Sequence, residues 1–105
     1  MRLAVCLASA HCNSRGLVHG GLIASLSDNA MGLSCAQQLR DGGRDIKGLV
    51  TVSLNTEFLG SAQLGSWLVV DPDHVKLGGS LAFARCIVRA DGKPVAQASA
   101  SFKIT

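Results

Sequence analysis

Residues 13–32, NSRGLVHGGLIASLSDNAMG, place several side chains that could do chemistry at the start of a predicted helix. Asp28 is a carboxylate among small and apolar residues, where burial costs on the order of a few kcal/mol unless the acid has a partner. Such an acid is more often functional than structural, because unpaired buried acids are rare. It could act as a general base for water or as a nucleophile that forms a mixed anhydride, and the sequence leaves both roles open.

Two glycines, Gly20 and Gly21, fall where this helix should begin. The first N–H groups of a helix lack intrahelical partners and lie at the positive end of its dipole, so they could polarise a substrate oxygen. Glycine would let that oxygen approach closely. The amide of Asn13 could orient a substrate or a water. His19 could act directly, hold the loop or Asn13 in place, or simply be a helix-entry residue bonded to the backbone.

The spacing between Gly20 and Asp28 limits how they can cooperate. Eight residues along a helix that rises about 1.5 Å per residue separate them by roughly 12 Å, which is too far for both to act on one carbon atom. We therefore expect a second subunit to supply the acid. A two-fold dimer with antiparallel helices side by side would bring each Asp28 opposite the other chain's Gly20.

The cysteines and histidines suggest a second and weaker candidate site, apart from the one around Asp28. The four cysteines show no C-x-x-C pairing, and no signal peptide precedes them, which predicts reduced thiols and a cytoplasmic protein. Cys12 follows His11, which raises the possibility of a Cys–His nucleophile or a metal ligand pair. No third group has suitable spacing to complete or orient such a pair, so we expect no metal site.

Apolar periodicity predicts the elements that must position these residues. Residues 2–10 alternate as a strand, and residues 20–40 have apolar or small side chains on several sides, which predicts a long helix in the interior. Its apolar positions at helical spacing are Leu22, Leu26, Ala30 and Leu33. Further strands are expected at 48–60, 65–78, 79–90 and 94–105. The order βαββββ predicts an α+β fold in which an antiparallel sheet wraps around one long helix.

Some details of the strands are also predicted. The segment 48–60 returns to alternation, which places its apolar residues on one face, namely Val50, Val52 and Leu54. Pro72 indicates an edge or a bulge in the next strand. The residues ADGK, 90–93, predict a tight hairpin turn before the last strand, whose inward positions are Ala96, Ala98, Ala100, Phe102 and Ile104.

Size and composition place the chain among single globular domains. A length of 105 residues predicts one domain, 1–105, and the hydrophobic content of 48% against 16% charged residues makes disorder improbable. No apolar run is long enough to cross a bilayer. A mean hydropathy of +0.32 is high for so small a domain, so we expect another copy of the chain to cover some apolar surface.

The charge pattern bears on the partners. The net charge is +3, the basic residues are scattered, aromatic residues make up only 4%, and tyrosine is absent. Nucleic acid is therefore not an expected partner, because there is neither a basic block nor a set of rings for base stacking. A smaller polyanion, such as a nucleotide-bearing cofactor, fits this charge better.

The residues also carry a resemblance to a known family. The pattern N-x-x-G-x-x-H-G-G, with an acid eight residues after the first paired glycine, resembles the signature of the PaaI-like acyl-CoA thioesterases of the hotdog-fold superfamily. Here it consists of Asn13, Gly16, His19, Gly20, Gly21 and Asp28. The stretch VTVSLNTEFLGSAQLG is similar to the family's second strand and following turn, and GGSLAFARCIVRADGKPVAQASASF is similar to its closing hairpin. The resemblance covers nearly the whole chain.

The resemblance implies a hotdog fold, an acyl-CoA thioesterase, and a homodimer with shared sites, which we expect to assemble further as a dimer of dimers. It implies that Asn13, His19 and Gly20 line the site with Asp28, and that the hydroxyl of Thr51 positions the water or the acid. Strand propensity alone would also explain Thr51. Gly21 would contact the substrate. Coenzyme A is part of the substrate, so no separate cofactor is expected.

Coenzyme A also needs cations for its phosphates. By charge alone the candidates are Lys76, Arg85 and Arg89, although a solvated strand face explains them equally well. The chain starts at the first strand, whereas members usually carry a further N-terminal segment that helps to cover the acyl pocket. Acyl-chain preference therefore stays open among small, medium-chain and aromatic groups.

Two other functions are compatible with the same fold. A hotdog module could bind acyl-CoA without turnover, as a sensor or a degenerate subunit, although the joint presence of Asn13, Gly20, Asp28 and Thr51 argues against it. A dehydratase or hydratase should carry its acid and histidine in reverse order on the helix. No histidine follows Gly21 in the predicted helix.

Overall fold

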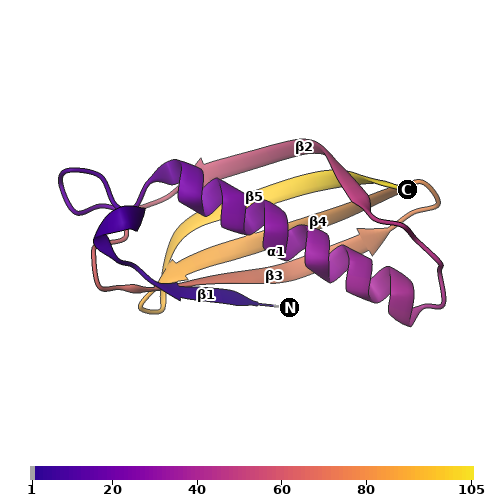
Figure 1. The fold of residues 1–105 in the computed structure, drawn as a ribbon, viewed down its shortest axis with the longest axis horizontal. Helices are drawn as coiled ribbons and strands as arrows, with labels where there is room; N and C mark the ends of the chain where they lie inside the picture. The colour runs from indigo at the N-terminus through magenta and orange to yellow at the C-terminus, as the bar shows by residue number, and fades with distance from the viewer. Residues whose placement is uncertain (1) are drawn as a thin grey trace.

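The structure, a computed structural model, describes residues 2–105. Over this range one long helix, α1 (Gly20–Asp41), lies diagonally across one face of a curled antiparallel sheet (Figure 1). The strands are β1 (Leu3–Cys6), β2 (Leu49–Phe58), β3 (Trp67–Leu77), β4 (Leu81–Ala90) and β5 (Lys93–Ile104). A short 3-10 helix, η1 (Ser9–His11), follows β1. The predicted α+β architecture and the order βαββββ are confirmed. The described residues include no helix long and apolar enough to span a membrane.

The sheet has one long open edge. Its strand order is β1-β3-β4-β5-β2, so β2 pairs with β5 on one side, and its other side is unpaired within residues 2–105. The opposite edge is closed only in part, because β1 covers β3 over the four pairs from Trp67 to Val70. Figure 1 shows β2 as the outermost strand along the side of the sheet reached by the N-terminal half of α1.

The inner face of the sheet is lined by small residues where α1 crosses it. Five buried alanines on β4 and β5 face the helix: Ala82, Ala84, Ala96, Ala98 and Ala100. Their small volume lets the helix approach the sheet closely. The helix buries a stripe against this surface made of Ile23, Ser27, Ala30, Met31, Ser34, Cys35 and Leu39. The prediction that α1 lies in the interior is confirmed only for the side of the helix that faces the sheet. On its other sides Leu33 is 40% exposed, and Leu22 and Leu26 are half-buried.

A bulge in β2 overturns the predicted alternation of that strand. Val50 pairs with Lys103, whereas Leu54 pairs with Ala100, and these two partners lie on opposite faces of β5. Val50 and Leu54 therefore do not share a face, and the prediction that they do is wrong. The cause is a register shift between Thr51 and Ser53 that inserts one residue into β2. The consequence is that Thr51, which pairs with the buried Phe102, lies on the side of the sheet that α1 covers.

The other two local predictions are confirmed. The register between β3 and β4 shifts between Pro72 and His74, beyond the end of the β1 pairing, so Pro72 marks a bulge. The hairpin between β4 and β5 turns at Asp91 and Gly92, whose φ angles are +48° and +85°. Two successive left-handed residues are typical of the type I′ turn, which matches the twist of the flanking strands.

Candidate active site

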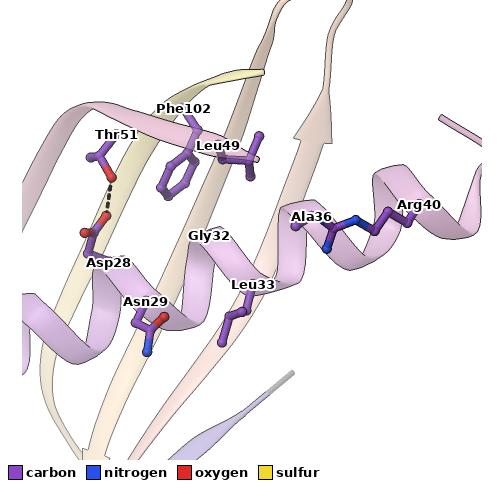
Figure 2. Close-up of a pocket in the computed structure, with 9 residues that line it drawn as sticks. All are labelled: Asp28, Asn29, Gly32, Leu33, Ala36, Arg40, Leu49, Thr51 and Phe102. Atoms are coloured by element: carbon purple, nitrogen blue, oxygen red, sulfur yellow. Dashed lines mark hydrogen bonds between the residues drawn. The ribbon is translucent and has the colours of Figure 1, made fainter. Parts of the chain in front are cut away.

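The carboxylate of Asp28 has a hydrogen-bond partner on the neighbouring strand. The hydroxyl of Thr51 on β2 donates to Asp28 Oδ1 at 2.7 Å (Figure 2). Asp28 is half-buried on α1, and the β2 bulge supplies the register that brings Thr51 beside it. The other oxygen, Oδ2, accepts no hydrogen bond within residues 2–105. One oxygen is therefore held in place while the second is available to accept a proton.

A cavity of about 310 Å³ extends from this pair along α1 and the end of β2. Its middle is apolar, and Figure 2 shows the ring of Phe102 pointing into the space between β2 and the helix. Gly32 lies beneath that ring, and a Cβ there would stand 3.4 Å from it, so the glycine leaves room for the aromatic side chain. The lining residues are Asp28, Asn29, Gly32, Leu33, Ala36, Arg40, Leu49, Thr51 and Phe102. Of these, sequence reasoning assigned a role in the site only to Asp28 and Thr51.

The start of α1 has the predicted geometry. The helix begins at Gly20, with His19 as the N-cap residue, and the His19 carbonyl accepts the N–H groups of Leu22 and Ile23. The N–H groups of Gly20 and Gly21 precede any possible intrahelical acceptor. They carry the positive end of the dipole of a 22-residue helix. This end of α1 can therefore stabilise a developing negative charge.

An aromatic ring that the sequence analysis did not name lies against Gly20. A Cβ at Gly20 would stand 3.1 Å from the Cζ atom of Phe58, whereas one at Gly21 would meet nothing within 4 Å. In this chain the missing side chain of Gly20 therefore makes room for Phe58. The open space expected for a substrate lies beside Gly21. Phe58 ends β2 and is 55% exposed, so its ring covers Gly20 and stays largely open on its other side.

The side chain of Asn13 organises the loop before the helix. Its Oδ1 accepts hydrogen bonds from the backbone N–H groups of Arg15 at 2.9 Å and Leu17 at 3.2 Å. The backbone N–H of Asn13 donates to the Leu17 carbonyl. This is an Asx-type turn, in which the side chain replaces a backbone acceptor. Because Oδ1 is engaged, the Nδ2 amide is the part of Asn13 that can donate to a substrate.

The imidazole of His19 does not hold this loop. The backbone N–H of His19 donates to the carbonyl of His11, and Nδ1 of His11 accepts the N–H of Ala8. The exposed His19 ring makes no hydrogen bond within residues 2–105, so, of the roles left open for it, the described contacts do not include a bond to the loop or to Asn13. Main-chain bonds and His11 therefore fix the entry to α1.

A single chain holds two separate halves of the predicted site. Phe58 contacts the Gly20 end of α1, and Thr51 contacts Asp28 two turns further on, so α1 and β2 run antiparallel along their contact. The helix keeps Gly20 and Asp28 roughly 12 Å apart by its rise. The geometry does not bring Asn13, His19 and Gly20 together with Asp28 and Thr51 in one chain.

Comparison with known proteins identifies the family. Residues 15–97 match the family model of the thioesterase superfamily. The chain belongs to this superfamily. It is 36% identical over 94 residues to a Pseudomonas aeruginosa protein named "putative esterase", and the match covers 90% of this chain and 67% of that protein. It is 35% identical over 91 residues to human acyl-coenzyme A thioesterase 13, with 83% of this chain and 60% of that protein covered.

A solved structure supports the same assignment. A Bacillus halodurans protein crystallised with CoA matches 99% of this chain and 66% of its own with a TM-score of 0.86 and 28% identity. The predicted hotdog fold and the resemblance to PaaI-like thioesterases are confirmed. The chain spans 60% to 67% of the length of these relatives.

The basic residues proposed for CoA phosphates in this superfamily member lie away from both half-sites. Lys76, Arg85 and Arg89 are on the outer face of the sheet, opposite α1. Arg85 donates two hydrogen bonds to Asp73, at 3.2 and 3.0 Å, and this pairing lowers the pKa of that carboxyl. Arg89 lies 3.8 Å from Asp71. Neighbouring acids therefore already pair with both arginines.

The cysteines offer no second centre to this thioesterase fold. Burial raises the pKa of the Cys35 and Cys86 thiols, which keeps them protonated and poorly nucleophilic. Within residues 2–105 no group of three or more His, Cys, Asp or Glu side chains is placed to hold a metal ion. The pairing of Cys12 with His11 has no third member there.

The contact between Gly20 and Phe58 can be tested by its effect on stability. Gly20→Ala should lower the free energy of unfolding by about 1 kcal/mol, because the new methyl group presses on the Phe58 ring. Gly21→Ala is the matched control and should be neutral or slightly stabilising, because its methyl group enters open space and alanine favours the helix. Urea denaturation followed by circular dichroism measures both. Combining Gly20→Ala with Phe58→Ala should remove the loss. An equal loss in that background would contradict the assigned contact.

Proposed function

We propose that this chain hydrolyses acyl-CoA thioesters to the free acid and coenzyme A, with a small, medium-chain or aromatic acyl group. The observation that carries the proposal is the Asp28 carboxylate, half-buried, held by Thr51 and open to a cavity. The family supports it, as do the human relative named acyl-coenzyme A thioesterase 13 and the structural neighbour crystallised with CoA.

In the proposed reaction the thioester carbonyl oxygen lies against the N–H groups at the start of α1. Gly20 and Gly21 polarise it there, and the Nδ2 amide of Asn13 orients the substrate or the water. Asp28 accepts a proton from water through its free oxygen as the water oxygen attacks the carbonyl carbon. The tetrahedral intermediate collapses, the C–S bond breaks, and the thiolate of coenzyme A takes up the proton. In the alternative route, an Asp28 oxygen attacks the carbonyl carbon, the C–S bond breaks and the coenzyme A thiolate leaves, which gives a mixed anhydride. Water then hydrolyses the anhydride to the free acid and the Asp28 carboxylate, and the thiolate takes up the proton that is released.

The two half-sites call for a second copy of the chain along the open β2 edge. This edge is ten residues long, contains neither lysine nor proline, and exposes Val50, Val52, Leu54 and Phe58, of which Val52 is 62% exposed. Long apolar edges without such blocking residues readily pair with another strand. We propose that two β2 strands pair antiparallel to make one continuous sheet across a homodimer.

The positions of the half-sites support this arrangement. The midpoint of α1 between Gly20 and Asp28 is Ala24, and the midpoint of β2 between their contacts Phe58 and Thr51 lies near Leu54 and Asn55. A two-fold axis that passes beside both midpoints, between the two copies of the chain, would pair the strands and set the helices antiparallel at the same time. It would also place Asn13, His19 and Gly20 of each chain opposite Asp28 and Thr51 of the other. Exposed Leu81 and Phe83 on the outer face would suit further pairing into a dimer of dimers.

A panel of acyl-CoA substrates distinguishes hydrolysis from the second candidate function, which is binding of acyl-CoA without turnover. We expect release of free thiol at neutral pH from at least one short, medium-chain or aromatic acyl-CoA, because base, oxyanion donors and cavity are all available to the dimer. A thiol-reactive dye measures the rate, and mass spectrometry identifies the free acid. Binding of the panel without any turnover would favour the non-catalytic module.

Substitutions at the hydrogen-bonded pair should have graded effects on that turnover. Asp28→Asn should lower kcat by about two orders of magnitude, the usual loss for a positioned base, and should leave the fold intact because asparagine can still accept from Thr51. Thr51→Ala should lower kcat by about tenfold, because it frees the acid from its position without removing it. Steady-state kinetics on the best substrate give both values, and thermal melts serve as the control. An Asp28→Asn enzyme with normal kcat would exclude the assigned role.

Mixed dimers test whether sites are shared between chains. Asn13→Asp keeps the Oδ1 acceptor of the loop and removes the amide donor, and Asp28→Asn removes the base, so each homodimer should be nearly inactive. In a mixed dimer one site collects both defects and the other has neither. Random mixing after unfolding and refolding should make about half of the dimers mixed and restore roughly a quarter of wild-type activity. No recovery, with mixed dimers shown by native mass spectrometry, would rule out shared sites.

A further inference from the structure

The cavity beside Asp28 has opposite charges at its two ends. Asp28 and Thr51 form one end, the middle is lined by Leu33, Ala36, Leu49 and Phe102, and Arg40 stands at the other. Twelve residues separate Asp28 from Arg40, which corresponds to roughly 18 Å along the helix axis. Figure 2 shows the Arg40 side chain extending back along α1 toward Ala36, so its guanidinium lies closer to the apolar middle than its backbone does.

The guanidinium of Arg40 has no partner in the part of the chain that the structure describes. By contrast, Arg44 on the following turn donates to the carbonyls of Gly78 and Gly79, and Arg85 is paired with Asp73. Arg40 is the cation among the residues that line the cavity. An apolar channel that ends at an unpaired guanidinium is complementary to a chain that carries an anion at its far end.

We propose that this groove selects acyl groups with a terminal carboxylate, whose methylene chain lies along Leu33, Leu49 and Phe102 and whose carboxylate binds Arg40. The proposal rests on the proposed function, since it takes the thioester carbon to lie at the Asp28 end. It adds to that function a substrate class, the ω-carboxyacyl thioesters, and a specificity-determining role for Arg40. A carboxylate that cannot reach Arg40 would gain nothing and would leave its charge in the apolar middle.

Matched pairs of acyl-CoAs test this selection. Each pair has the same chain length and ends in either a methyl group or a carboxylate: butyryl and succinyl, hexanoyl and adipyl, octanoyl and suberyl, decanoyl and sebacyl. Binding is measured by calorimetry on Asp28→Asn protein, which holds substrate without turnover, and kcat/KM is measured on the active enzyme. In at least one of the longer pairs the carboxylate member should bind about tenfold more tightly, as expected for a charge-assisted hydrogen bond. The succinyl pair should show no such gain.

Variants assign the preference to Arg40. Arg40→Met should abolish or reverse it with little effect on the methyl-ended partner, and Arg40→Lys should keep part of it. Lys103→Met is the matched control, because it removes one positive charge from the outer face of β5 and should leave the preference unchanged. Arg40 is exposed, so we expect the variants to fold, and thermal melts with Arg40→Gln as a second neutral variant check this.

Further outcomes distinguish a wrong role for Arg40 from a wrong proposed hydrolysis. If Arg40→Met weakens both members of every pair equally, Arg40 contacts the phosphates of coenzyme A and the inference is wrong. Acyl N-acetylcysteamine thioesters, which lack phosphates, should still show the carboxylate preference if it is right. Turnover without any preference would overturn the inference alone. A preference in binding without turnover of any substrate would overturn the proposed hydrolysis alone.

Discussion

The alanine-lined inner face of β4 and β5 is the constraint on which the rest of the structure depends. Small side chains at Ala84, Ala98 and Ala100 let α1 lie close to the sheet, and Gly32 on the helix leaves room for the larger Phe102. Close packing of this kind allows little sliding, because a displaced helix would lose dispersion contacts along its whole buried stripe. The helix is therefore fixed in register with the strands, and that register decides which strand residue meets Asp28.

The β2 bulge is the second device that positions the acid. Without the extra residue between Thr51 and Ser53, the residues before the bulge and the residues after it could not both keep their present orientation toward the helix. One of the two segments of β2 would turn its outer face to α1. With it, Thr51 and Leu54 both lie on the helix side although they are three positions apart. An irregularity that weakens the ladder locally thus places a hydroxyl 2.7 Å from a half-buried carboxylate. Bulges are often found where a strand must re-aim a side chain.

Much of the fold could be predicted from the sequence, because helix and strand periodicity are local signals. The start of α1 at Gly20, the turn at Asp91 and the bulge at Pro72 each follow from the conformational preference of one or two residues. The bulge in β2 could not be predicted in this way, since no glycine or proline marks it and only the pairing with β5 reveals it. Phe58 and Arg40 were missed for a similar reason. A phenylalanine at a strand end and an arginine in the last turn of a helix are ordinary features, and their meaning comes from what the fold places beside them.

The direction of the cavity limits how a substrate can lie in the proposed dimer. From Asp28 the cavity runs toward the C-terminal end of α1, and so away from Gly20 of the same chain. A substrate whose acyl group fills it must therefore place its reacting carbon at the Asp28 end, with the thiol carrier leaving in the opposite direction. In the proposed antiparallel pair, the partner's helix start, with its Asn13 loop, occupies that opposite side. The partner would then supply the oxyanion donors, while the chain that supplies the acid also supplies the groove that selects the acyl group. A change in acyl preference could then arise from α1 and β2 of one chain without disturbing the donors that polarise the thioester.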